Sequence, residues 1–233
     1  MRSGIKGFCT ILMLMMVAVC VKVSAQNKST QEQDEAYTKM INLRAGKITS
    51  NLGIIDSAKY YRVTAIVAGQ YRALNEIYND RDSRKKAIKE QTADNKEAAK
   101  TQLDALDLEI TAKVNKQHQV YLKKLSKELS PEQVDKVKDG MTYNVKNVTY
   151  NAYMQMLPDL SGEQKKQILD WLIEAREHSM DAESSEKKHA WFGKYKGRIN
   201  NYLSKSGIDM KKAEADWQER IKEKQKQQAP NNG

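Results

Sequence analysis

The sequence predicts an all-α fold: a helical bundle of six or seven helices with one long antiparallel helix hairpin. Apolar residues recur at intervals of three and four through most of the 233 residues. Only 3 prolines and 11 glycines interrupt this pattern, which is too few for a loop-rich or all-β chain. Short polar segments carrying helix-capping residues separate the periodic stretches. These observations together favour one helical domain.

The first 25 residues have the organisation of a secretory signal peptide. Arg2 and Lys6 supply a positive start, an apolar run covers residues 8–21, and residues 23–25 are suited to cleavage before Gln26. The run is shorter than the roughly 20 residues of a membrane-spanning helix. We therefore expect an exported protein, periplasmic or secreted, with no membrane span.

Both cysteines of the chain, Cys9 and Cys20, lie inside this leader. A mature chain cut after Ala25 has no thiol, and it can form no disulfide, thiolate metal site or cysteine nucleophile. Cys20 leaves an alternative open, a lipid-anchored cysteine at the new N-terminus. The residues before it, 17–19, match the small-residue pattern of lipoprotein signals poorly.

The chain is basic, with a formal net charge of +10. Residues 1–25 hold three basic and no acidic residues, so their removal leaves +7. A basic protein can attract anionic sugars, phosphates or lipid headgroups. Export makes nucleic acid an unexpected partner. The simpler interpretation of the charge is scattered lysine on solvated helix faces.

The mature chain is expected to hold a loose N-terminus over residues 26–33, a single helical domain over 34–228 and a tail over 229–233. The first helix covers residues 34–50 and ends at Asn51 and Gly53, because both residues tolerate a left-handed backbone. Its apolar positions are Tyr37, Met40, Ile41, Leu43, Ala45 and Ile48.

Two long helices follow. Asp56 caps the second helix, whose apolar stripe weakens after Asn79 into a charged run at residues 80–86. The third helix begins near Asp94, which has capping-box spacing to Glu97, and reaches residue 128. Each helix has one apolar side to bury, so the pair predicts an antiparallel hairpin. Its bend lies between residues 79 and 94.

A short repeat marks two further helix starts. Residues 129–133 read Leu-Ser-Pro-Glu-Gln and residues 160–164 read Leu-Ser-Gly-Glu-Gln. In each copy the serine caps a helix, and the glutamine three residues later returns a bond to the backbone of the cap. Between the copies we expect an ordered loop after Gly140 and a short helix over 150–157. The last helices are expected over residues 162–180, 184–206 and from 209 onward.

Residues 188–202 form the most distinctive segment. Trp191, Tyr195 and Arg198 share one helix face with Tyr202. In one interpretation these rings fill the core, while Gly193 and Gly197 let a neighbouring helix approach closely.

In the other interpretation this face binds a ligand. Trp191 and Tyr195 offer flat apolar surfaces, and Lys194, Arg198 and Asn201 supply hydrogen bonds. Such a mixture suits a sugar, and it suits an acidic sugar better because arginine pairs with a carboxylate.

The loop residues Tyr143 and Asn144, with Tyr150 and Tyr153, form a second cluster of rings and amides. Loops often carry binding residues, although tyrosines that seal the edge of a core explain the cluster equally well. The candidate ligand-binding residues are therefore Trp191, Tyr195, Arg198, Lys194, Asn201, Tyr143 and Asn144.

No motif identifies a reaction. His118, His178 and His189 do not form the i, i+4 pair of a helical zinc site, and we predict neither a metal nor a cofactor. Glu177 and Asp181 can share a helix face. Ordinary ion pairs at the surface of a charged helix account for this spacing. A nucleophile elbow, a P-loop and a glycine fingerprint are all missing from the sequence, so catalytic residues are not assigned.

Three segments carry a resemblance to a known family. Residues 69–75, 171–177 and 188–200 resemble a family of uncharacterised secreted helical proteins, a domain of unknown function found in glycan-degrading, gut-type Gram-negative bacteria. The resemblance covers residues 37–210 and implies export, a helical fold and carbohydrate binding, the one role suggested for that family. It implies no catalytic residues.

The two Leu-Ser-x-Glu-Gln copies also resemble the L-T-x-x-Q repeats of small periplasmic stress chaperones. We therefore expect an exported, non-catalytic helical protein that binds a glycan or acidic sugar in glycan capture or utilisation. The alternative is a periplasmic, holdase-like chaperone, which needs an exposed apolar surface.

Overall fold

The structure is a computed structural model that describes residues 32–228. This part of the chain contains eight helices and no strand, so the all-α fold class is confirmed, with more helices than the six or seven expected. The signal peptide predicted over residues 1–25 and the tail over 229–233 lie outside the described residues. Residues 32–50 form the first helical segment, and the others are α2 (Ser57–Gln91), α3 (Lys96–Glu128), α4 (Pro131–Met141), α5 (Val145–Met156), α6 (Gly162–Met180), α7 (Ser185–Lys205) and α8 (Met210–Gln228).

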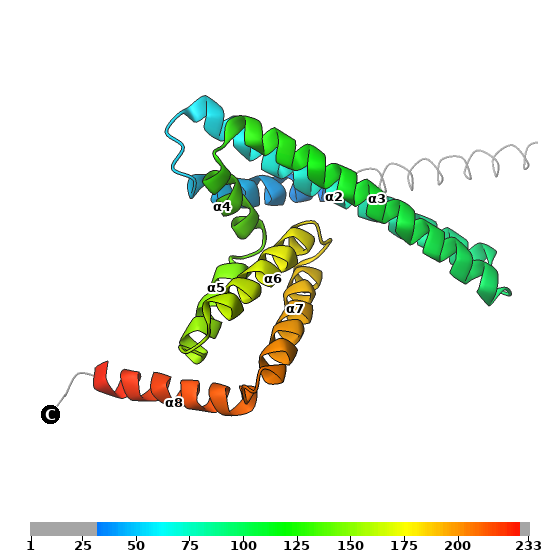
Figure 1. The fold of residues 1–233 in the computed structure, drawn as a ribbon. Helices are drawn as coiled ribbons and strands as arrows, with labels where there is room; N and C mark the ends of the chain where they lie inside the picture. Colours follow the sequence, from blue (N-terminus) through cyan, green and yellow to red (C-terminus); the bar gives the residue numbers. More distant parts are fainter. Residues whose placement is uncertain (1–31, 229–233) are drawn as a thin grey trace, which may run out of the picture.

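The predicted hairpin is the longest feature of the molecule, and α2 lies antiparallel to α3 along its length (Figure 1). Asp56 caps α2 as expected, accepting bonds from the backbone of Ala58 and Lys59. The helix then runs through the charged stretch to Gln91. That stretch stays helical because its cations pair with acids of α3, as in the contacts of Arg84 with Glu109 and Lys85 with Asp107.

Two details of the sequence interpretation need correction. Asn95, and not Asp94, caps α3, since its side chain accepts a bond from the backbone of Ala98. The expected loop over residues 140–149 is mostly helical, because α4 continues to Met141 and α5 already begins at Val145.

A tight turn without glycine joins α4 to α5. Tyr143 and Asn144 both adopt a left-handed backbone, with φ of 56° and 58°. Such a conformation is uncommon for a bulky residue such as tyrosine. The turn spans only residues 142–144, and α5 then packs beside α6.

Both serine caps are confirmed. Ser130 accepts a bond from the backbone of Gln133, and Ser161 accepts one from Gln164, with the glutamine side chains returning bonds in both copies. Further along, Ser184 caps α7, and Gly207 ends it with a φ of 86°.

The buried apolar residues form two clusters. The first, core A, joins the segment 32–50, α2, α3 and α4, and it includes Met180 at the end of α6. The second, core B, joins α5, α6 and α7, with residues of α8 at its edge. Figure 1 shows the hairpin crossing above the α5–α8 group. The C-terminal end of α6 therefore lies where the two cores meet.

Candidate functional site

A cleft of about 420 Å³ lies at the junction of the two cores. The hairpin forms one wall, and the end of α6, the following segment 181–183 and the start of α7 form the other. The lining is mixed, with rings, carboxylates, cations and an amide. It consists of Tyr78, Arg81, Asp107, Ile110, Thr111, Val114, Asn115, His118, Glu177, His178, Asp181, Ala182, Glu183, Lys187 and Trp191.

Asp181 fixes the inner end of this cleft. One of its carboxylate oxygens lies 2.6 Å from Nδ1 of His118, and the other accepts a bond of 3.0 Å from the amide of Gln70. Its backbone carbonyl accepts a bond from the hydroxyl of Tyr78. Asp181 follows α6, whereas its partners belong to α2 and α3. These bonds therefore hold the two walls of the cleft together.

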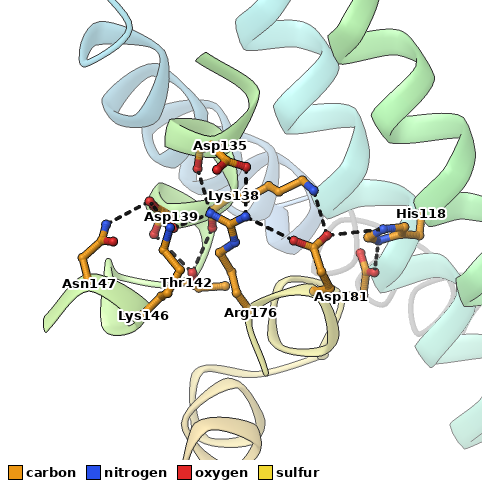
Figure 2. A network of polar contacts seen from close by, with 10 residues as sticks. His118, Asp135, Lys138, Asp139, Thr142, Lys146, Asn147, Arg176 and Asp181 are labelled. Atoms are coloured by element: carbon orange, nitrogen blue, oxygen red, sulfur yellow. Dashed lines mark hydrogen bonds and ion pairs between the residues drawn. The ribbon is translucent and has the colours of Figure 1, made fainter. Parts of the chain in front are cut away.

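A second set of charges continues from His118 towards α4. Glu177 lies 3.7 Å from Nε2 of His118 and also accepts a bond of 2.8 Å from Lys138. Its other oxygen lies 3.3 Å from Arg176. The side chain of Arg176 is only 2% exposed and contacts Asp135 and Asp139 on α4. Figure 2 shows Arg176 between these two acids on one side and His118 on the other.

The network raises two pKa values. The hydrogen bond that His118 donates to Asp181 raises the pKa of His118 above its usual 6.5, although partial burial opposes the shift. The pKa of Arg176 is also raised: its burial opposes the shift, and the bonds to Asp139 and its other carboxylate partners outweigh that burial. Both shifts favour the protonated, positively charged form of the side chain beside its carboxylate partners.

Trp191 is the predicted ligand-binding residue that lines the cleft. Its indole is half-buried and stacks on the imidazole of His178, with ring centroids 4.5 Å apart. The ammonium of Lys194 lies 5.1 Å from the centre of the indole. A ligand in the cleft would thus meet Trp191 and His178 as one stacked pair.

The other predicted residues of α7 lie elsewhere. Tyr195 is 6% exposed within core B, and burial together with a hydrogen bond to Glu174 raises its pKa to about 12. Arg198 lies over the ring of Trp171 and 3.6 Å from Glu174. Asn201 is exposed. The shared helix face expected for Trp191, Tyr195 and Arg198 therefore does not form one site.

The turn residues Tyr143 and Asn144 do not line this cleft. Tyr143 is 49% exposed and stacks on His189 with centroids 5.5 Å apart. Asn144 accepts a bond from the amide of Asn147 within α5. Gly193 and Gly197 face open space, so the close helix approach suggested for them does not occur among the described residues.

The charged and amide residues that line the cleft were not predicted as site residues. Glu177 and Asp181 were interpreted as surface contacts, and His118 only as a failed zinc ligand. One feature of the sequence could have identified His118. It lies on the apolar stripe of α3, between Val114 and Tyr121. A histidine in such a position needs a partner on the facing element.

The arrangement provides binding groups more clearly than catalytic ones. Each carboxylate of the lining already has a cation or hydrogen-bond partner within the protein. Across residues 32–228, no cluster of histidine, cysteine or acidic side chains could hold a metal ion. Over the same residues, none of the helices has the length and apolarity to cross a membrane.

Comparison with known families gives one match. Residues 38–223 match a family described as "Protein of unknown function (DUF3826)". This match covers most of the chain, so the protein belongs to that family. No curated protein matches the sequence.

Proposed function

We propose that this member of the DUF3826 family is an exported, non-catalytic protein that binds carbohydrate in the cleft between its two cores. The observation that carries the proposal is the stacked pair of Trp191 and His178 on the wall of a polar cleft. Sugars combine apolar C–H faces with many hydroxyls, so they need both rings and hydrogen-bonding groups in one place.

The size and position of the cleft support binding of a small oligosaccharide. Ligand pockets commonly measure about 300–1,000 Å³ and often lie where two packed units meet. The cleft, at about 420 Å³, has this size and this position. The side chain of Asn115 lines it and makes no hydrogen bond to another described residue, so its amide is available to a ligand hydroxyl.

The charges of the lining favour a neutral sugar over an acidic one. Glu177, Asp181 and Glu183 all face the cleft, and their internal partners leave no spare cation for a carboxylate. Arg198, the residue predicted to pair with an acidic sugar, lies instead on Trp171 and Glu174. Hydroxyl groups can still bond to the outer lone pairs of these acids.

Export is part of the proposal and rests on the signal-peptide pattern of residues 1–25. A glycan-capturing protein must meet polysaccharide outside the cytoplasm, which agrees with such a leader. We infer that the protein then acts together with the proteins of a glycan-utilisation system.

A glycan array with residues 26–233 tests the proposal. We expect binding to a subset of neutral oligosaccharides and weaker binding to their uronic acid counterparts. A parallel assay measures whether the protein suppresses aggregation of an unfolded client. Suppression without a response to any glycan would replace the proposal by the chaperone alternative, and release of shortened products would contradict a non-catalytic role.

A further inference from the structure

A second, smaller cavity adjoins the cleft and shares Tyr78, Ala182 and Glu183 with it. Its volume is about 150 Å³. Four tyrosine rings line it, together with two cations and the start of α7. The tyrosines are Tyr37, Tyr71, Tyr78 and Tyr143, and the cations are Arg44 and Lys188.

Lys188 is a buried amine without an acidic partner. Its residue is 6% exposed, and its Nζ donates to the carbonyls of Met141 and Met180 at 3.0 and 3.3 Å. The ring of Tyr71 lies 5.4 Å away. Within residues 32–228, no carboxylate lies within ion-pair distance of this ammonium. Burial accordingly lowers the pKa of Lys188 to about 8.

Arg44 is the second cation, and it too is unpaired. Seven other arginines occur in residues 32–228, and each makes an ion pair or a hydrogen bond. Arg44 makes neither with any residue of that range, although it lines the cavity beside Lys188. After burial, two charges act on the pKa of Lys188: the carboxylate of Asp181 raises it, and the guanidinium of Arg44 lowers it.

The acids near this cavity are already engaged. Glu183 lines it, but its two oxygens pair with Arg81 and Lys187. Asp181 is bound to His118 and Gln70. The cavity therefore holds two cations and no spare anion, and the positive end of the α7 dipole, capped by Ser184, adds to this field. A buried charge without a counter-ion is costly, so such a cavity attracts one.

We propose that this cavity, the Arg44–Lys188 pocket, binds a small oxyanion, with a carboxylate or sulfate group between the ammonium of Lys188 and the guanidinium of Arg44. The surrounding tyrosine rings cover the less polar part of the ligand. The pocket adjoins the glycan cleft, but neither cation of the proposed site lines that cleft, so the proposal does not depend on glycan binding. The chemistry is shared by inorganic sulfate and by an acidic monosaccharide such as galacturonate.

Calorimetric titration of residues 26–233 with sulfate and with galacturonate at pH 7 tests the pocket. We expect one site for at least one probe, and a loss of at least tenfold in affinity in Arg44→Gln. Arg44 is exposed, so this change should leave the fold intact. Arg62→Gln is the matched control, because Arg62 pairs with Glu128 outside the pocket and should leave the affinity unchanged.

A rise in pH provides a second readout that does not need a Lys188 variant. The groups facing Lys188 are Arg44, Tyr37, Tyr71, Tyr78, Tyr143, Asp181 and Glu183. The Tyr71 and Tyr78 hydroxyls stay neutral, since burial raises the pKa of each to about 12. Affinity should therefore fall between pH 7 and pH 9.5 as Lys188 loses its proton.

The two probes separate the sources of the anion. Binding of sulfate alone identifies an inorganic oxyanion site, and binding of galacturonate identifies an acidic-sugar site. Failure of both probes to bind overturns the proposal, as does an Arg44→Gln variant with wild-type affinity. If no neutral glycan binds on the array, the titration with anions is unaffected. The two proposals can therefore be contradicted independently.

Discussion

His118 and Asp181 lie in contact across the junction of the two cores, with Nδ1 of the imidazole 2.6 Å from the carboxylate oxygen. His118 belongs to α3, and Asp181 directly follows α6. The contact therefore couples the hairpin to the α5–α8 group, and it does so at the base of the cleft.

This contact predicts a dependence of stability on pH. The pKa of His118 is raised above 6.5 in the folded protein by Asp181, so protonation favours folding. The contribution is fully present below pH 6.5 and is lost as pH rises through the raised pKa. Urea unfolding should show a free energy of unfolding that His118 leaves unchanged below pH 6.5 and lowers as pH rises above it. His118→Gln should remove most of that slope, and a variant that keeps it would show that other groups cause it.

Lys188 predicts a trend of the opposite sign at higher pH. Burial lowers its pKa from 10.5 to about 8 in the folded state, so the buried ammonium destabilises the protein below pH 8. The free energy of unfolding should therefore rise between pH 8 and pH 10.5, as the folded protein releases this proton first. Unfolding measured in a buffer without oxyanions checks this, because a bound anion would mask it. A flat or falling profile in that window would contradict the argument.

Among the ion-paired residues, we expect substitution of Arg176 to lower the free energy of unfolding most. Replacing it with methionine leaves the mostly buried Asp139 without its main partner, which should cost about 3 kcal/mol of unfolding free energy. The control is Asp135→Asn, whose side chain is 56% exposed and whose loss should cost less than about 1 kcal/mol. Denaturant unfolding of the two variants measures both losses of stability. Equal losses in the two variants would contradict the prediction.

Two glycine substitutions should act in opposite directions. Gly193→Ala places a methyl in open space within α7 and should stabilise the protein by about 1 kcal/mol. Gly140→Ala places it 3.0 Å from Cγ1 of Ile48, a buried residue of core A, and the overpacking should outweigh the helical gain. Thermal unfolding of both variants tests this, and a stabilised Gly140→Ala would show that Ile48 can move.

Local signals predicted the helices well because their caps are encoded within four residues. Ser130 with Gln133, and Ser161 with Gln164, make the expected reciprocal bonds. The long hairpin followed from the single apolar face of each helix. These features depend on near neighbours in the chain, so the sequence suffices to predict them.

Two local features were missed. The left-handed turn at Tyr143 and Asn144 contains no glycine. The periodicity of residues 140–149 is neither clearly helical nor clearly that of a strand, so a loop was predicted there. The cap of α3 is Asn95 and not Asp94. Asparagine and aspartate cap helices about equally well, so residue type alone could not identify the correct position.

The candidate site was predicted only in part because it depends on contacts between residues far apart in the sequence. Trp191 lines the cleft, whereas Arg198 contacts residues of α6. The spacing of residues within α7 cannot predict those contacts. His118 and Asp181 are separated by 63 residues, and only the packing of α3 against the end of α6 brings them together.

The most direct test of the carbohydrate-binding claim is a calorimetric titration of the best neutral oligosaccharide from the array into wild type, Trp191→Ala and Trp217→Ala. Trp217 lies on α8 and not in the cleft, so it controls for loss of an indole. The account predicts that Trp191→Ala loses affinity by at least about tenfold, or ~1.4 kcal/mol, while its helical circular dichroism is unchanged and Trp217→Ala binds normally. Wild-type affinity in Trp191→Ala, or unfolding of that variant, would contradict the account.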